Sequence, residues 1–381
     1  MIAKKALDMP PFIVMEILEK AQELERQDKN VIHLEIGEPD FATPQAVKDA
    51  GCAAIQQDKT RYTHSLGLLE LREAICEHYY EKYNIKILPD QVIVTSGTSP
   101  AMLLVFSALL NPGQKVILSN PGYACYPNFI RFADGEPTFI NVYEEDGFQY
   151  RPDDIRAALD SKTKAIIINS PSNPTGNILS EPVMREISEM AQGGLYIISD
   201  EIYHGLVYEG KAHSILEFTD KAFVLNGFSK LYAMTGWRLG YAIVPKEFIR
   251  PIQKIQQNLF ISANSFVQWA GIAALKETAD DVARMAKTYN ERRKYLIPRL
   301  REIGFGITVE PTGAFYVLAN AKKFGADSYK LALDILENAL VAVTPGIDFG
   351  DNAEGYLRFS YANSLENIIE ACDRLENYLT A

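Results

Sequence analysis

The chain of 381 residues is poor in cysteine and contains no long apolar run. Its four cysteines are scattered without a C-x-x-C pair, which is typical of reduced thiols in a cytosolic protein: Cys52, Cys76, Cys125 and Cys372. No apolar run is long enough to span a membrane, and the first residues lack the apolar core of a signal peptide. We therefore expect a cytoplasmic protein without a membrane partner.

Positive charge is also scarce, because 38 lysines and arginines face 49 acidic residues and give a formal net charge of −11. This balance argues against nucleic acid as a main partner, and it means that an anionic ligand needs a local positive site. The five histidines show no ligand spacing such as H-x-x-x-H: His33, His64, His78, His204 and His213. We expect no metal site and interpret these histidines as structural.

What the chain does contain is the ordinary composition of a globular protein, with 47% hydrophobic and 23% charged residues and length enough for two domains. Between residues 42 and 280, short apolar segments rich in Val and Ile alternate with helical patterns. The predicted strands are residues 92–95, 116–119, 165–169, 195–199, 223–226 and 241–244. Continuous apolar strands indicate a sheet covered on both faces, so this region is predicted to be a doubly wound α/β domain.

The pattern changes after residue 280 and predicts a smaller α+β domain. A charged helix over 289–302 leads into a strand-like segment at 313–318 and a helix at 329–339. Strands at 340–343 and 356–360 and a closing helix complete it. Near the N-terminus, apolar residues at helical spacing predict a further helix over residues 12–26, after a Pro-Pro pair.

Ligands in open α/β sheets bind outside the carboxyl ends of the strands, so the polar residues at those ends are candidates. The strand at 92–95 is followed by Gly97, Thr98, Ser99 and Pro100. Ser99 suits an N-cap and Pro100 the first helical position, so the N–H groups of residues 97–99 would face an anion. An ordinary helix cap is the alternative.

The next strand ends supply an amide, an acid and a phenol. Asn173 stands in an Asn-Pro turn that leaves its amide free to donate, although the turn itself is a sufficient structural role. Asp200 and Tyr203 would share a face if a helical turn begins there, although a strand-end acid is often an N-cap. Together these groups suit a protonated pyridine ring that carries a phenolic oxygen.

A fourth strand end supplies Lys230, in the segment Gly227-Phe228-Ser229-Lys230, with Arg238 eight positions later in Thr235-Gly236-Trp237-Arg238-Leu239-Gly240. A desolvated lysine beside a hydroxyl and a guanidinium suits Schiff-base chemistry next to a bound phosphate. Each residue alone would be interpreted as a surface lysine or a structural arginine. The spacing from Lys230 to Gly240 resembles the signature of class I pyridoxal-phosphate aminotransferases, and the resemblance extends from Gly37 to Arg358.

This resemblance implies the fold of the fold type I pyridoxal-phosphate enzymes and a role for each candidate. Lys230 would form the Schiff base with pyridoxal 5′-phosphate, and Asp200 would keep the pyridine nitrogen protonated. Tyr203 and Asn173 would contact the phenolic oxygen, and Tyr123 would stack on the ring. The residues implied at the phosphate are Gly97, Thr98, Ser99, Ser229 and Arg238.

The resemblance also implies a homodimer with shared active sites and a substrate clamp. Tyr62 resembles the tyrosine that reaches the phosphate of the neighbouring subunit, although a packed aromatic is the alternative. Arg358 would bind the substrate carboxylate, with Asn173 and Gly37 beside the substrate, although a buried ion pair is an alternative for this arginine. The N-terminal helix would join the small domain, which divides the chain into 42–280 and 1–41 with 281–381.

Two positions depart from the family pattern. Gly227 stands where many relatives have a serine that binds the phosphate. Ser99 stands where the bacterial aspartate branch has a lysine that binds the substrate's distal carboxylate. The second departure favours a neutral, aromatic or mixed amino donor.

The predicted function is transfer of an amino group between an L-amino acid and a 2-oxo acid in two half-reactions. A pyridoxal-phosphate-dependent C–S β-lyase shares the fold and the cofactor, so the motifs leave that alternative open. A non-catalytic regulatory module is a further alternative. Against it, no helix-turn-helix segment precedes the domain, and every catalytic position is filled.

Overall fold

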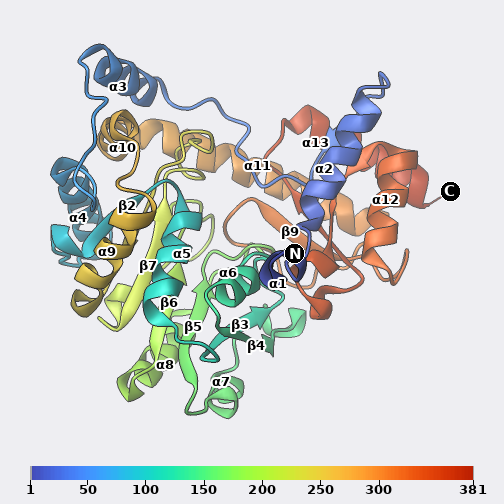
Figure 1. Ribbon diagram of the computed structural model, residues 1–381. Helices are drawn as coiled ribbons and strands as arrows, with labels where there is room; N and C mark the ends of the chain where they lie inside the picture. Colours follow the sequence, from blue (N-terminus) through green and yellow to red (C-terminus); the bar gives the residue numbers. More distant parts are fainter. Residues whose placement is uncertain (1, 381) are drawn as a thin grey trace.

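A computed structural model describes residues 2–380, so Met1 and Ala381 lie outside the described residues. Its largest sheet has seven strands in the order β2-β8-β7-β6-β5-β3-β4 (Figure 1). Their bounds are β2 (Val92–Thr95), β3 (Lys115–Asn120), β4 (Glu136–Asn141), β5 (Thr163–Asn169), β6 (Tyr196–Asp200), β7 (Ala222–Gly227) and β8 (Gly240–Ile243). The sheet is mainly parallel, because only β8 runs antiparallel to its neighbours β2 and β7. The carboxyl ends of the other six strands therefore meet at one edge.

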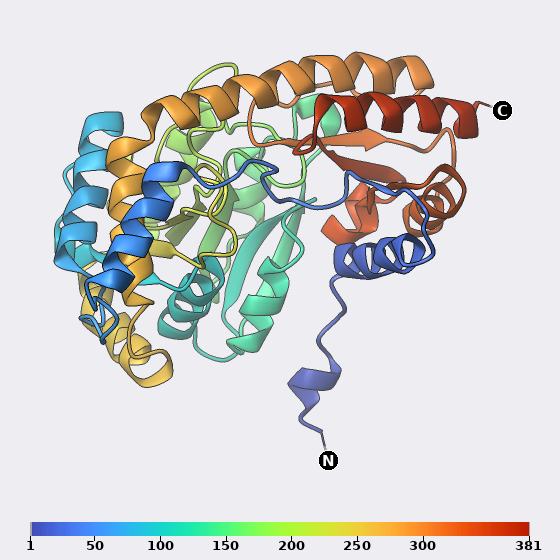
Figure 2. The same ribbon diagram turned by 90° about the horizontal axis from the view of Figure 1, so that it is seen from above.

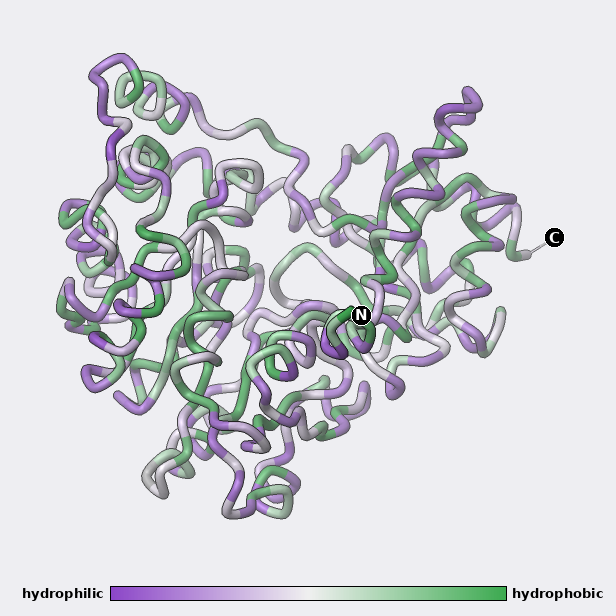
Figure 3. Tube along the Cα trace, viewed as in Figure 1, coloured by the Kyte–Doolittle hydropathy of each residue, from purple (hydrophilic) through white to green (hydrophobic). Residues whose placement is uncertain are grey.

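Both faces of this sheet are covered, as the apolar strands predict. Alternate residues of β5 belong to different cores, with Ile166 and Ile168 on one face and Ile167 on the other. One face packs on α5 (Thr98–Leu109), α6 (Tyr126–Phe132) and α9 (Ile249–Leu259). The core on the other face includes α4 (Leu69–Tyr83), α7 (Pro152–Ala158), α8 (Glu181–Met190) and α10 (Ser265–Glu277), and α3 (Gln45–Gln56) packs against α10. Figure 3 shows the central strands as mainly hydrophobic. The predicted doubly wound α/β architecture is confirmed.

The strand β4 is absent from the sequence-based prediction. It lies at the sheet edge, and among the described strands it pairs only with β3. Three of its residues, Glu136, Phe139 and Asn141, are exposed to solvent. Pro137 within it is compatible with an edge strand. An edge strand that is buried on one side only lacks the continuous apolar run by which the inner strands were predicted.

The C-terminal part forms smaller sheets and is joined to the large sheet by α11 (Ala279–Ile303), which spans both parts (Figure 2). This helix begins ten residues before the predicted one at 289. An antiparallel sheet in the order β11-β12-β9 comprises β11 (Thr344–Pro345), β12 (Tyr356–Ser360) and β9 (Tyr316–Asn320). The predicted strand at 340–343 is wrong in its extent, because the chain changes sheets there: β10 (Val341–Ala342) pairs with β1 (Ile32–His33), and β11 pairs with β12.

The N-terminal segment lies with this C-terminal part. It contains α1 (Lys4–Leu7) and α2 (Ile13–Glu25), and α2 packs against β10 and β11. The helices α12 (Ser328–Ala339) and α13 (Leu365–Leu379) pack on the same small sheets. Within residues 2–380, no helix combines the length and the apolar composition that a membrane span requires.

Candidate active site at the carboxyl edge of the sheet

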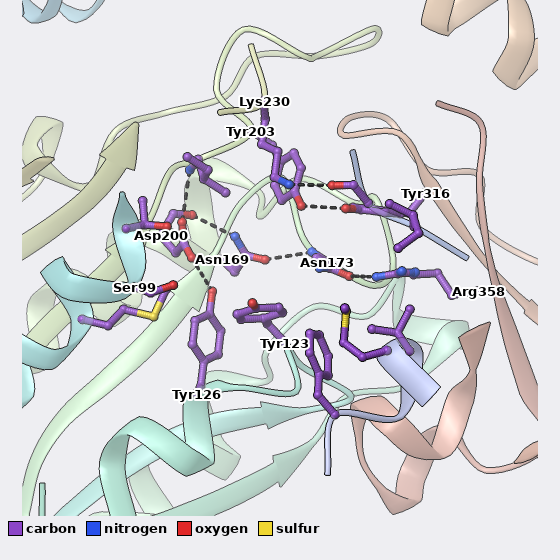
Figure 4. Close-up of a pocket in the computed structure, with 18 residues that line it drawn as sticks. Ser99, Tyr123, Tyr126, Asn169, Asn173, Asp200, Tyr203, Lys230, Tyr316 and Arg358 are labelled. Carbon is purple, nitrogen blue, oxygen red and sulfur yellow. Dashed lines mark hydrogen bonds between the residues drawn. The ribbon is translucent and has the colours of Figure 1, made fainter. Parts of the chain in front are cut away.

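A cavity of about 200 Å³ opens at the edge where the parallel strands end, between the large sheet and the C-terminal part. It collects residues from distant parts of the chain, including Phe12 of the N-terminal segment and Tyr316 of β9. Nine of the residues singled out from the sequence line it: Gly37, Thr98, Ser99, Tyr123, Asn173, Asp200, Tyr203, Lys230 and Arg358. Figure 4 shows most of these side chains around one space.

Asp200 is the last residue of β6 and lies almost fully buried at the base of the cavity. One carboxylate oxygen accepts a hydrogen bond from the Tyr126 hydroxyl at 2.7 Å, and the other accepts from the Ile202 N–H at 3.1 Å. Burial raises the pKa of Asp200 to about 6, although both hydrogen bonds oppose that rise. A turn, rather than a helix, brings Tyr203 to the same cavity. Asp200 is therefore an acid that can hold or share a proton near neutral pH.

A chain of amides connects Asp200 to Arg358 across the cavity (Figure 4). Asn169, at the end of β5, donates to the Asp200 carbonyl at 2.9 Å and accepts from the Asn173 N–H at 2.8 Å. The Asn173 side-chain oxygen accepts from Arg358 Nη1 at 2.8 Å. This bond leaves the NH₂ group of Asn173 as the part of its amide that can donate into the cavity.

Lys230 follows β7 and projects into the cavity near Tyr203 (Figure 4). Its Nζ donates to the Gly37 carbonyl. The pKa of Lys230 is lowered to about 8, chiefly by burial and in addition by the guanidinium groups of Arg358 and Arg238, while the carboxylates of Glu38 and Asp200 oppose this shift. A lysine in this environment is partly neutral near physiological pH, which is the form that acts as a nucleophile or a base.

The start of α5 lies close to Arg238, but it differs from the prediction in one detail. The helix begins at Thr98 with Gly97 in the capping position, so Ser99 is not the N-cap. Gly97 has a φ of +101°, which a glycine adopts without strain, and the chain can therefore enter the helix two residues before Pro100. A Cβ on Gly97 would lie 2.7 Å from an Arg238 nitrogen, so glycine also permits this approach.

Arg238 lies beside the first turn of α5, an arrangement that suits an anion. The N–H groups of a helix's first turn have no partner within the helix, and the helix dipole favours negative charge there. Arg238 donates to the Thr235 carbonyl at 3.0 Å, and no carboxylate of residues 2–380 lies within 4 Å of it. Ser229 precedes Lys230 on the same loop but does not line the 200 Å³ cavity, and neither do Gly97 and Arg238. Gly97 and Arg238 lie together at the α5 terminus, next to Thr98 and Ser99 of the cavity.

Arg358, on β12, is 4% exposed and has no carboxylate partner in the described part of the chain, so the ion-pair alternative is wrong. Besides Asn173 it donates to the Glu35 carbonyl and to the Thr344 hydroxyl. Its guanidinium carbon lies 4.4 Å from the centre of the Tyr316 ring, and its Nε is buried without a partner. A buried cation with an unused donor is an arrangement that binds a carboxylate.

Gly37 and Tyr62 occupy very different positions. A Cβ on Gly37 would lie 2.0 Å from the Tyr316 hydroxyl, so only glycine permits the close approach of this loop to the cavity. Tyr62 is 83% exposed and lies on an open surface with Arg61 and Phe266, so it is not a packed aromatic of its own chain. It does not line its own chain's cavity.

Three further polar residues escaped the sequence analysis. Asn169 ends β5, and a consistent use of the strand-end rule would have identified it. Tyr126 donates to Asp200, and Tyr316 forms a 2.8 Å hydrogen bond with Tyr203 between their hydroxyls. No sequence signal marks these two tyrosines, because their contacts depend on how α6 and β9 approach the sheet.

A lysine and a buried acid at neighbouring strand ends, with an arginine beside a helix N-terminus, line and border a cavity on an α/β fold. The sequence matches the family described as aminotransferase class I and II over residues 29–375. The chain belongs to this aminotransferase family, whose members use pyridoxal phosphate, and it is a pyridoxal-phosphate-dependent aminotransferase of fold type I.

Individual relatives match over the full length of the chain. It is 46% identical to a (5-formylfuran-3-yl)methyl phosphate transaminase of Methanocaldococcus jannaschii, with 100% of both chains covered. It is 40% identical to an aspartate aminotransferase of Pyrococcus horikoshii, covering 99% of this chain and 97% of the relative. Among solved structures, an aspartate aminotransferase of Thermus thermophilus with maleate has a TM-score of 0.96 at 37% identity, with both chains fully covered.

Proposed function

We propose that this cavity binds the cofactor and carries out transamination with the residues that line and border it. Lys230 would bond to the cofactor aldehyde, Asp200 would pair with the ring nitrogen, and Tyr203 and Asn173 would contact the phenolic oxygen. Tyr123 would stack on the ring, and the phosphate would be held by Gly97, Thr98, Ser99, Ser229 and Arg238. The observation that carries this proposal is that Asp200 and Lys230 line one cavity beside a cationic helix terminus.

The residues present fit this cofactor. The unpaired Arg238 at the start of α5 suits a phosphate, and a buried acid with a raised pKa suits a pyridine nitrogen. When bound, pyridoxal phosphate accepts the amino group of the substrate and withdraws electrons from its α-carbon. The proposed sites for the cofactor ring, the cofactor phosphate and the substrate carboxylate thus lie in or beside the same cavity.

The protein's own groups would position the substrate and move its proton. Arg358 would bind the α-carboxylate with its free Nε and its nearby Nη groups, supported by Asn173. Lys230, once free of the cofactor, would take the α-proton and deliver a proton to the former aldehyde carbon of the cofactor, because its pKa of about 8 suits both directions. The Gly37 carbonyl would hold the lysine amine at the cavity wall.

We also propose the division of the chain into a large domain, 42–280, and a small one, 1–41 with 281–381. The pairing of β1 with β10 and the start of α11 at Ala279 support these boundaries. The cavity then lies between the domains, so their relative movement would exclude water from bound substrate. The free state of all four cysteines supports a cytoplasmic location.

The exposed Tyr62 supports a homodimer in which this residue reaches the phosphate of the partner's site. A mixing experiment tests this proposal. Lys230→Ala and Tyr62→Ala subunits are each impaired alone, but a mixed dimer has one site with both wild-type residues. We expect activity to return on mixing if Tyr62 acts across the interface. No recovery in dimers shown to have exchanged subunits would refute the shared site.

A single-turnover measurement tests transamination itself. The loaded enzyme is mixed with an excess of one amino acid and no oxo acid. We expect one equivalent of 2-oxo acid per active site and then no further product, with the cofactor left in its amine form. Continuous release of pyruvate and ammonia would instead establish a β-lyase, and no conversion of any amino acid would refute the catalytic proposal.

A further inference from the structure

A second cavity, of about 220 Å³, lies directly behind the wall of the first. The two cavities share three lining residues, Phe12, Tyr123 and Tyr126. The Phe12 and Tyr123 rings meet edge to face with centroids 6.3 Å apart and an interplanar angle of 87°. This aromatic pair is therefore the partition between the two spaces.

The position of Phe12 in this partition is stabilised by hydrogen bonds at the start of α2. Asp348 accepts hydrogen bonds from the N–H groups of Ile13 at 3.1 Å and Val14 at 3.3 Å, immediately after Phe12. The backbone next to Phe12 is thus anchored at the start of the helix. The size of the side chain at position 12 therefore sets how far the two cavities are separated.

The first cavity leaves limited room for a large substrate side chain beside the cofactor. Its 200 Å³ must accept the cofactor ring and the substrate's amine and carboxylate, because Asp200, Lys230 and Arg358 all face it. An apolar cavity of about 150 Å³ is large enough to bind benzene, so the second space can accept an aromatic ring. The second cavity is therefore the nearest space for a long substrate side chain.

The charged residues of the two cavities indicate which kind of substrate side chain they accept. The three charged residues of the first cavity are assigned to the cofactor and the α-carboxylate. In the second cavity, Arg131 is exposed at the rim, and the Asp348 carboxylate accepts from the N–H groups of Ile13 and Val14. The opposite charges of these two side chains sum to zero. Most of the remaining walls are apolar, with Leu118, Phe139 and Phe349 among them, although Ser119 and Asn128 also line this cavity.

We propose that the second cavity is the distal part of the substrate side-chain site and accepts large apolar or aromatic side chains, with Phe12 setting the size limit. This inference rests on the proposed function of the first cavity. It extends that function by naming the substrate class, amino acids with a bulky uncharged side chain. Acidic donors would place an unpaired carboxylate against the apolar walls, which is costly.

Two substitutions of Phe12 in opposite directions test the inference. Phe12→Ala should raise the ratio of kcat/KM for tryptophan to that for alanine by about tenfold, since one methylene in an apolar pocket already changes it by about 10–200-fold. Phe12→Trp should lower the same ratio by about tenfold. Phe132→Ala is the matched control, because Phe132 is a half-exposed aromatic that lines neither cavity, and it should leave the ratio unchanged.

Two readouts separate this inference from the function on which it rests. In the wild type, kcat/KM for phenylalanine should exceed that for aspartate by about tenfold or more. The unreactive 3-phenylpropionate should bind to the loaded enzyme more tightly in Phe12→Ala than in Phe12→Trp, measured by the cofactor spectrum. An equal ratio in both variants, or a preference for aspartate, would overturn the inference while transamination stands. No turnover of any amino acid would instead refute the proposed function.

Discussion

Asp200 and Glu201 are neighbours in the chain, both are nearly inaccessible to solvent, and yet they lie in very different surroundings. Burial raises the pKa of Asp200 to about 6 and that of Glu201 to about 7. Successive side chains at a strand end point to opposite faces, so Asp200 borders the cavity (Figure 4) and Glu201 enters the packed core. The two acids therefore provide an internal comparison of a site with a structural network.

The difference between them lies in their partners. Glu201 accepts hydrogen bonds from the Ser199 hydroxyl at 3.1 Å, the Ser214 hydroxyl at 2.9 Å, the Ile215 N–H at 3.0 Å and the Tyr79 hydroxyl at 3.2 Å. Asp200 has two donors and faces open space. A perturbed pKa alone does not identify a functional acid; a perturbed pKa beside a cavity, with unused capacity to bind, does.

The largest expected effect is that of Lys230→Ala, which removes the proposed nucleophile and base. We expect turnover to fall by about 10⁴-fold, at the upper end of what a general acid–base group contributes. Stability in the absence of cofactor should not fall, because a partly desolvated ammonium is removed. Thermal unfolding and amino-acid turnover check both parts, and turnover equal to that of the wild type would contradict the assignment.

Asp200→Asn should lower turnover by about 10²–10³-fold, the usual effect of removing one group that stabilises developing charge. The free energy of unfolding should change little, since the amide oxygen can accept from the Ile202 N–H and the Tyr126 hydroxyl can turn to accept from the amide NH₂. Kinetics and urea unfolding measure the two quantities. A variant that is unstable but fully active would reverse the roles that we give the two acids.

Glu201→Gln should have the opposite outcome, with turnover near that of the wild type and a loss of about 1–3 kcal/mol in stability from the disturbed hydrogen bonds. The pH dependence gives a second test. Because the pKa of Glu201 is raised to about 7, the native state retains a proton that the unfolded chain has released. Wild-type stability should therefore fall as pH rises from about 4.5 to about 7, and the variant should lack that contribution. An unchanged pH dependence would contradict this account.

Among the substitutions at the cavity, the smallest loss of turnover is expected for Tyr126→Phe, which keeps the ring and removes the hydroxyl that donates to Asp200. That hydrogen bond lowers the pKa of Asp200, so its loss should raise this pKa further above 6. We expect about a tenfold loss of turnover, corresponding to one hydrogen bond to a charged group, and a partial recovery as pH rises. Tyr150→Phe is the control, because its hydroxyl donates to the Ile167 carbonyl and does not line the 200 Å³ cavity. Equal pH profiles for both variants would refute a role for Tyr126.

The sequence predicted those residues of the site that lie at the carboxyl ends of parallel strands. Asp200, Asn173 and Lys230 each follow a parallel strand, so one topological rule places them at one edge. Tyr126 and Tyr316 reach the site through tertiary packing that no local pattern encodes. The wrong N-cap at Ser99 has a local cause: serine and proline preferences at a helix start were outweighed by the positive φ of Gly97. The edge strand β4 and the change of sheets after residue 342 likewise depend on neighbours distant in sequence.

The protonation state of the cofactor's ring nitrogen tests the separate roles of the two acids most directly. It can be measured by nitrogen NMR of enzyme loaded with pyridoxal phosphate labelled with ¹⁵N in the ring. We predict a protonated nitrogen in the wild type and in Glu201→Gln, and an unprotonated nitrogen in Asp200→Asn. A nitrogen that stays protonated in Asp200→Asn, or loses its proton in Glu201→Gln, would contradict the account.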